Sequence, residues 1–89
     1  MWHTGSFVLF YLANDSKKVA FVASKKVGKA VQRNRAKRLL RAIFLEFIDT
    51  HKSGYYILVA KAEILNQKYS ILKNQWKRAL SKSNLLKDL

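Results

Sequence analysis

The segment Ser24–Phe44 constrains the fold more than any other part of the chain, because it combines strong positive charge with a helical pattern of apolar residues. It contains eight Lys and Arg residues and no Asp or Glu among its 21 residues. Apolar residues recur at helical spacing in this segment and just beyond it: Ala36, Leu39, Leu40, Ile43, Phe44 and Phe47. The pattern predicts an amphipathic helix over about Val31–His51, ended by Gly54, with one apolar and one basic side.

The basic side of this expected helix carries side chains that suit phosphate binding. At about 100° per residue, its centre holds Asn34, Lys37, Arg38 and Arg41, with Arg33 and Arg35 at the two margins. A guanidinium group can bind a phosphate through two parallel hydrogen bonds, and an Asn amide can bond a phosphate, a sugar or a base edge. A solvated surface helix usually mixes both signs of charge, but no residue between Asp15 and Glu46 is acidic. The pattern therefore favours binding to a polyanion.

The composition of the whole chain supports the same conclusion. Eighteen Lys and Arg against five Asp and Glu give 89 residues a formal net charge of +13. Such a charge destabilises a small domain by self-repulsion unless a partner neutralises it, and nucleic acid is favoured over an anionic membrane or an acidic protein. The absence of cysteine excludes disulfides and cysteine-bound zinc. Without an export signal or about 18 consecutive apolar residues, we expect a cytoplasmic protein with no membrane partner.

Three short segments rich in aromatic and β-branched residues are predicted strands: Ser6–Ala13, Lys18–Ser24 and Tyr55–Ala62. The turn-forming sequence NDSK joins the first two, so we expect them to pair as an antiparallel hairpin. A last helix is predicted over Asn66–Lys82, with Asn66 as its cap. Its apolar stripe would comprise Tyr69, Leu72, Trp76, Ala79 and Leu80.

The order strand, strand, helix, strand, helix predicts an α+β fold, a two-layer sandwich in which helices cover one face of a small sheet. We expect one RNA-binding domain over residues 1–89, with 1–5 and 83–89 as loose ends. Both faces of the first strand are apolar, so the uncovered face would expose aromatic and aliphatic side chains. Such a face can act as a stacking platform for unpaired bases.

Residues suited to catalysis are few and scattered. The acids are Asp15, Glu46, Asp49, Glu63 and Asp88, and of these Glu46 and Asp49 alone would share a helix face. A two-metal nuclease site needs several carboxylates that converge from different elements. His3 and His51 have no partner at metal-ligand spacing. We therefore expect neither a catalytic side chain nor a metal site in this chain.

The segment SKKVGKAVQRNRAKRLLR, residues 24–41, resembles the signature S-K-K-x-G-x-A-V-x-R-N-R-x-K-R-L-x-R of the bacterial ribonuclease P protein family. Every fixed position of the signature matches. The strands on either side and the basic last helix also fit the family, so the resemblance covers about Ser6–Lys82. A structural RNA-binding module, such as a ribosomal protein, would share the charge but would have no reason to carry this signature. A nuclease acting alone is disfavoured by the missing carboxylate cluster.

The resemblance implies a small basic subunit of a ribonucleoprotein that removes the 5′ leader from precursor tRNA. The large RNA is then the catalyst and uses Mg²⁺, no protein partner is required, and the connection from strand to helix to strand is left-handed. By matching position, the residues that hold the catalytic RNA would be Lys25, Lys26, Lys29, Arg33, Asn34, Arg35, Lys37, Arg38 and Arg41. The leader cleft on the open sheet face would be lined by Val8, Phe10 and Ser24.

The start of the chain departs from the family pattern. Family members usually begin with a basic segment and a short helix whose aromatic residues form part of the leader cleft. Here only MWHTG precedes the first expected strand. We therefore expect that Met1 is an internal methionine or that the chain is truncated.

Overall fold

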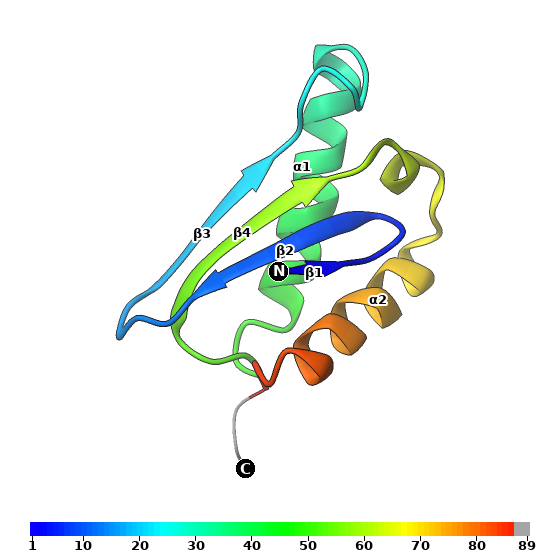
Figure 1. Ribbon diagram of the computed structural model, residues 1–89. Coiled ribbons are helices and arrows are strands. Elements are labelled where there is room, and N and C mark those ends of the chain that lie inside the picture. Colours follow the sequence, from blue (N-terminus) through cyan, green and yellow to red (C-terminus); the bar gives the residue numbers. More distant parts are fainter. Residues whose placement is uncertain (87–89) are drawn as a thin grey trace.

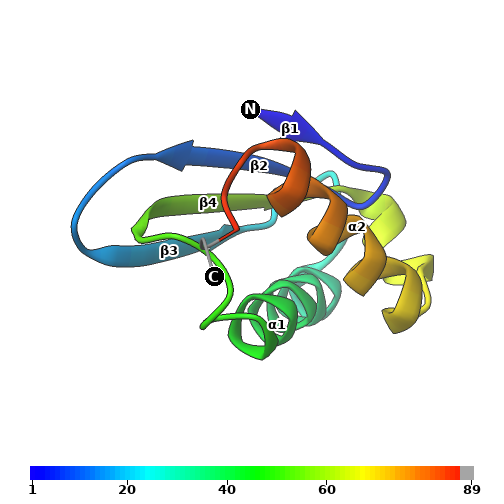
Figure 2. The same cartoon turned by 90° about the horizontal axis from the view of Figure 1, so that it is seen from below.

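The computed structural model describes residues 1–86 and has two layers, a four-stranded sheet and a pair of helices on one of its faces (Figures 1 and 2). Its elements, in chain order, are β1 (Trp2–His3), β2 (Phe7–Leu12), β3 (Lys17–Val22), α1 (Ala30–Glu46), β4 (Gly54–Ala60), the 3₁₀ helix η1 (Ala62–Asn66) and α2 (Tyr69–Lys82). The predicted α+β sandwich and the order of its main elements are confirmed. No helix within residues 1–86 is long and apolar enough to cross a membrane.

The sheet has the strand order β1-β2-β4-β3, so the predicted hairpin is wrong. β4 lies between the two expected partners, antiparallel to β2 and parallel to β3. Turn residues show only that the chain reverses direction, and not that the two strands they join are neighbours. Residues 13–16 are long enough to cross an intervening strand, a distance of about 10 Å. β4 takes the central position because Tyr56, Leu58 and Ala60 are buried on its core face and its other face is apolar as well.

The connection from β3 through α1 to β4 is left-handed, as the family resemblance implied. β3 and β4 point the same way in Figure 1, β4 lies to the right of β3, and α1 passes behind the sheet. Figure 2 shows from below that α1 and α2 both lie on that side. Crossovers between parallel strands are almost always right-handed, so the hand could not have been inferred from general rules.

The core lies between the sheet and the two helices and is built around aromatic rings. The centroid of the Phe44 ring, on α1, lies 5.4 Å from that of Tyr56, 6.2 Å from that of Trp76 and 4.5 Å from that of His51. Trp76 is 1 % exposed, as predicted for a core residue. Phe7 packs against Trp76 with a centroid distance of 5.9 Å, which ties the first long strand to the last helix. Tilted and edge-on ring pairs of this kind stabilise a core beyond the area they bury.

α1 ends at Glu46, five residues before the end that the sequence predicted. Turns follow, with the Thr50 amide donating to the Phe47 carbonyl at 2.9 Å, and they carry His51 into the core. The His51 ring is fully buried, and its Nε2 lies 3.3 Å from the Phe44 carbonyl oxygen. Burial of this ring among aromatic neighbours is incompatible with a continued helix. Gly54 consequently opens β4 and does not terminate α1.

The second helix begins later than predicted, and Asn66 is not its cap. Asn66 is the last residue of η1, which forms because Ile64 is drawn completely into the core. Lys68 is the residue that precedes α2, and its carbonyl accepts the amides of Ile71 and Leu72 at 3.1 Å. Tyr69, expected in the apolar stripe, is exposed instead.

The expected loose ends are held by the fold where the structure describes them. Trp2 and His3 pair with Leu9 and Val8 of β2. At the other end, Leu85 is buried and its carbonyl accepts the amide of Lys52 at 2.7 Å. Residues 87–89, the last part of the expected C-terminal loose end, lie outside the described residues.

Replacing Gly54 with Ala is expected to destabilise the fold. Gly54 has φ +145°, and an added Cβ would overlap the Tyr11 ring that covers it. Strain at such a position costs about 1–3 kcal/mol, so we expect the free energy of unfolding to fall by about 2 kcal/mol in urea denaturation. Gly5→Ala is the control, because its Cβ would meet only the end of the flexible Gln75 side chain at 3.3 Å. Equal losses in the two variants would contradict this interpretation of Gly54.

Replacing Tyr56 with Phe is expected to change how stability depends on alkaline pH. Burial raises the pKa of the Tyr56 hydroxyl above its ordinary value of 10.0, with a further contribution from Tyr11, and this hydroxyl donates to the Lys52 carbonyl. The stability that the neutral hydroxyl contributes is therefore fully present below pH 10 and is lost as the pH rises through the raised pKa. The free energy of unfolding of the variant should be about 1 kcal/mol lower than that of the parent chain at pH 7. Above pH 10, it should fall less steeply with pH, as measured by urea denaturation. Tyr55→Phe is the control, and a decline as steep in Tyr56→Phe as in the parent chain would refute the assignment.

Candidate nucleic-acid interface

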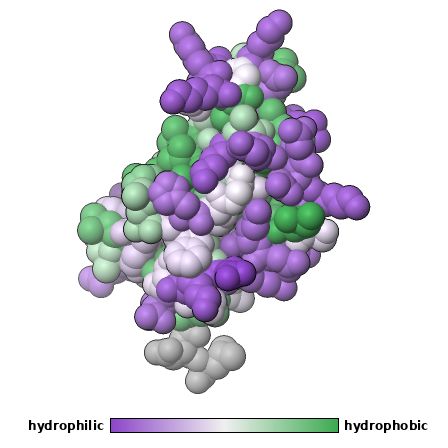
Figure 3. Space-filling model, turned by 45° about the vertical axis from the view of Figure 1, so that its right-hand side comes forward, coloured by the Kyte–Doolittle hydropathy of each residue, from purple (hydrophilic) through white to green (hydrophobic). Residues whose placement is uncertain are grey.

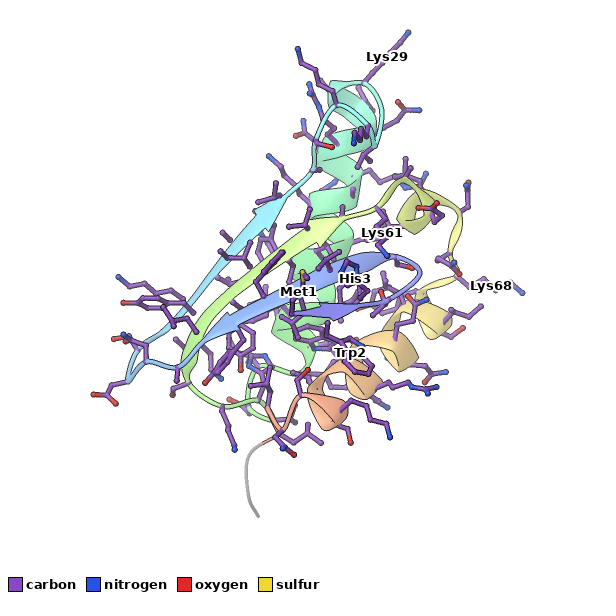
Figure 4. All side chains as sticks on the ribbon, viewed as in Figure 1. Met1, Trp2, His3, Lys29, Lys61 and Lys68 are labelled. Carbon is purple, nitrogen blue, oxygen red and sulfur yellow. The ribbon has the colours of Figure 1, made fainter. Side chains whose placement is uncertain are left out.

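The start of α1 concentrates positive charge. The Gln32 side chain folds over Gly28 and its Oε1 accepts the Lys29 amide at 2.7 Å, which closes the first turn. No acidic residue lies in that turn, so nothing offsets the positive end of the helix dipole. The side chain of Lys29 projects away from the body of the protein at this end (Figure 4). A helix start of this kind attracts anions.

Four of the predicted RNA-binding residues share one shallow groove along the outer side of α1. We call it the α1 basic groove, and it is lined by Asn34, Lys37, Arg38 and Arg41, with Val31 at its end. The guanidinium carbon of Arg41 lies 5.4 Å from the centroid of the Phe21 ring on β3, an attractive contact that restrains this side chain.

The other predicted residues lie on the two flanks of the helix. Arg33 lines a second shallow groove with Lys25, Gly28, Lys29 and Gln32. Arg35 faces the opposite flank, where it lines a groove between α1 and η1. Lys26 is exposed in the loop before α1, outside these three grooves. The predicted residues thus surround α1 from its start to Arg41, about two thirds of its length, and do not form one patch.

The cations of this surface are not neutralised by the protein. Among residues 1–86, no carboxylate forms an ion pair with any Lys or Arg between Lys25 and Arg41. Glu46, the acid of α1, points toward α2, where it pairs with Lys73 at 3.0 Å and accepts the Tyr69 hydroxyl at 2.9 Å. These two hydrogen bonds, that of Lys73 first, lower the pKa of the Glu46 carboxyl. Glu46 therefore strengthens the contact between the helices and leaves the charge of the α1 basic groove intact.

The sheet face opposite the helices is apolar and open. The strand register places its side chains in three rows across β2, β4 and β3: Val8–Val59–Val22, Phe10–Ile57–Ala20 and Leu12–Tyr55–Lys18. Phe10 is 39 % exposed and Ile57 43 % exposed, at the centre of this face. In Figure 3, hydrophobic surface gathers on the left, the side to which this face turns, while hydrophilic side chains cover much of the right. We call these three rows the open sheet face.

The structure brings the predicted leader-binding residues to this side of the molecule. Val8 and Phe10 stand two residues apart on β2, on the open sheet face. Ser24 follows Val22 by two residues, beyond the end of β3, and its Oγ accepts the Lys26 amide at 3.3 Å. Ser24 therefore lies where the loop to α1 leaves the sheet.

Several residues of the open sheet face were missed from the sequence. The sequence pattern indicates Val22, Ile57 and Val59 as strand residues, and their alternation along β3 and β4 is the signal that marks the exposed positions. For His3 the sequence raised only the question of a metal ligand. Its pairing opposite Val8 places it beside this face at the β1 edge of the sheet, and Figure 4 shows Trp2 and His3 at that edge.

No group of three His, Asp or Glu side chains that could hold a metal ion occurs within the residues that the structure describes. The surface around α1 offers cations of the kind that bind phosphates, and the sheet offers apolar side chains of the kind that contact bases.

The sequence matches a known family over nearly its whole length. Residues 1–84 fit the family model described as Ribonuclease P. A Ribonuclease P protein component from Nitratiruptor sp. is 43% identical over 81 residues, which cover 91% of this chain and 74% of the relative. The chain belongs to the ribonuclease P protein family. Another protein of that name, from Coprothermobacter proteolyticus, is 39% identical over 70 residues, and the match spans only 56% of its length.

Solved structures of the ribonuclease P protein family have the same fold. The RNase P protein of Staphylococcus aureus superimposes with a TM-score of 0.81 at 22% identity, over 97% of this chain and 82% of that chain. The RNase P protein of Thermotoga maritima gives a TM-score of 0.79 at 22% identity, over 91% and 80% of the two chains. The family predicted from the signature is confirmed, and with it the function of a ribonuclease P protein subunit in tRNA processing.

The double variant Arg33→Ala/Arg35→Ala is expected to bind ribonuclease P RNA more weakly and with less dependence on salt. Each lost phosphate contact lowers the slope of log Kd against log salt concentration by about 0.7–0.9. Filter binding at several KCl concentrations measures this slope. The control is Arg78→Ala/Lys82→Ala on α2, which removes the same charge away from α1. If both double variants change the slope equally, Arg33 and Arg35 contribute only general charge.

Proposed function

We propose that this chain docks on the ribonuclease P RNA through the basic surface around α1 and holds the 5′ leader of precursor tRNA on the open sheet face. The observation that carries this proposal is the juxtaposition of two unlike surfaces in one small domain. One offers uncompensated cations, and the other offers exposed apolar side chains. The first suits the phosphates of folded RNA and the second suits unpaired nucleotides.

The docking surface has the length and the charge for several phosphate contacts. α1 comprises 17 residues, so it is about 25 Å long. Cations lie on its outer side, on both flanks and in the loop before it. Since no carboxylate within residues 1–86 pairs with these cations, they can displace the counterions that surround the RNA phosphates at every contact.

The open sheet face suits a leader that differs from one precursor to the next. Its central row presents Phe10 and Ile57, which offer apolar surface against which a base can stack. Stacking depends on the flat face that every base has and does not read the sequence. A cation is also available at one end of the face, where Lys18 Nζ lies 5.7 Å from the Tyr55 ring centroid. This combination supports binding of unpaired RNA without a strict sequence requirement.

In this proposal the RNA subunit performs catalysis with Mg²⁺, and the residues of this chain bind and position the RNA. The protein's cations replace part of the counterion atmosphere, so less Mg²⁺ is needed when the protein is present. The complex needs no further protein partner and acts in the cytoplasm.

Phe10→Ala is expected to remove most of the advantage that the protein gives to substrates with a leader. The assay combines ribonuclease P RNA and this chain at low Mg²⁺ with precursor tRNAs that carry either a long leader or a one-nucleotide leader. The parent chain should rescue cleavage of both and favour the long leader. Stacking of one base is worth about 1–3 kcal/mol. The variant should therefore bind the long-leader substrate about tenfold more weakly, and its affinity for the one-nucleotide-leader substrate should not change.

Ile71→Ala on α2 is the matched control, because Ile71 is 44 % exposed and lies away from the sheet face. Rescue of both substrates to the same extent by the parent chain would show that the open sheet face does not hold the leader. Failure to rescue either substrate, together with no binding to the RNA, would refute docking through α1.

A further inference from the structure

Val31 is an apolar side chain exposed on the most basic part of the molecule. It is 77 % exposed, more than Leu45 at 54 % near the other end of α1. A β-branched residue at an exposed helical position improves neither the helix nor its solvation. Val31 forms part of the wall of two grooves, the α1 basic groove and the groove on the η1 side of the helix. It therefore forms the ridge between them.

The second of these grooves, which we call the α1–η1 groove, combines an apolar floor with polar walls. It has a volume of about 470 Å³. Val27 is buried beneath it and Leu65 is half-buried, so its floor is apolar. The remaining lining residues are polar or small and stand around that floor: Gln32, Arg35, Ala62 and Asn66.

We propose that the α1–η1 groove holds one unpaired nucleotide of the RNA that docks on α1. Val31 and Leu65 would contact the flat faces of the base. The Asn66 amide and the Nε2 of Gln32, whose Oε1 already accepts the Lys29 amide, would offer hydrogen bonds to its edge. Arg35 would bind the adjacent phosphate. This inference rests on the proposed docking of α1, because Val31 lines both the α1–η1 groove and the α1 basic groove.

The arrangement gives the two arginines of the R-N-R sequence different partners. Arg33 lies on the flank with Lys25 and Lys29, where the surroundings are cationic. Arg35 lies on the other flank beside apolar side chains and amides. The first setting binds phosphates alone, whereas the second binds a nucleotide that leaves its helix. The groove would thus contribute shape specificity to an interface otherwise dominated by charge.

Base-specific chemical probing of ribonuclease P RNA tests this proposal, with dimethyl sulfate for A and C and a carbodiimide for G and U. The RNA is transcribed from the ribonuclease P RNA gene of Nitratiruptor sp., the organism of the relative that is 43% identical. Val31→Ala removes the ridge, and Ala62→Glu places a bulky acid at the mouth of the groove. We expect at least one unpaired base to be protected by the parent chain and reactive with both variants. Loss of a stacked base should raise Kd about threefold for Val31→Ala and about tenfold for Ala62→Glu.

Each groove variant has a matched control. Leu45→Ala removes a comparable exposed side chain from α1 outside the groove, and Asn74→Glu makes the same change of charge on the exposed side of α2. Both controls should leave that base protected. Circular dichroism measures whether all four variants fold as the parent chain does.

The results separate failure of this proposal from failure of the docking on which it rests. If the parent chain does not bind the RNA, the docking of α1 is refuted, and the groove has no role in it. If the parent chain binds but the groove variants leave every protected base protected, the α1–η1 groove is empty in the complex. Equal effects of Ala62→Glu and Asn74→Glu would likewise overturn the proposal, since they would show an effect of net charge only.

Discussion

The packing of Phe44 against Tyr56 and Trp76 is the contact on which the rest of the structure depends. It joins α1, the central strand β4 and α2 in one cluster of rings, with centroid distances of 5.4 and 6.2 Å from Phe44. Because both helices are held on the same side of the sheet, the other side has no cover. Because the apolar side of α1 is used in this packing, its basic side must face outward. The two surfaces that bind RNA in our proposal therefore follow from one arrangement of the core.

The high net charge of the chain is tolerated because of where the cations lie. A charge of +13 on 89 residues opposes folding by self-repulsion. Most cations of α1 stand on its outer side or flanks, where solvent screens them. Glu46 does not reduce this charge, since it is bonded to Lys73 and Tyr69 of α2. Selection for folding alone would favour a mixture of signs on such a surface, so the remaining excess indicates a partner that supplies the negative charge.

The local features of this fold could be predicted from the sequence, and the non-local features could not. The 3.6-residue period identified both sides of α1, and the apolar stripe identified Trp76 as core, because these patterns report on residues close in the chain. The position of β4 between β2 and β3 depends on contacts across the whole sheet, so turn chemistry alone gave a wrong hairpin. The end of α1 depends on burial of His51, a residue that no local pattern marks. The hand of the crossover came from family resemblance only.

In the candidate site, too, local features could be predicted from the sequence and non-local ones could not. The signature predicted the RNA-binding residues around α1, but the distribution of these residues over three grooves depends on η1 and on the loop before the helix. Phe21 connects the two surfaces: its ring lies under Arg41 of the α1 basic groove, while its neighbours Ala20 and Val22 belong to the open sheet face. The strand β3 is thus shared by both surfaces, and side chains alternate across it. If both surfaces bind RNA as we propose, a rigid strand in this position would fix the distance between the docked RNA and the leader.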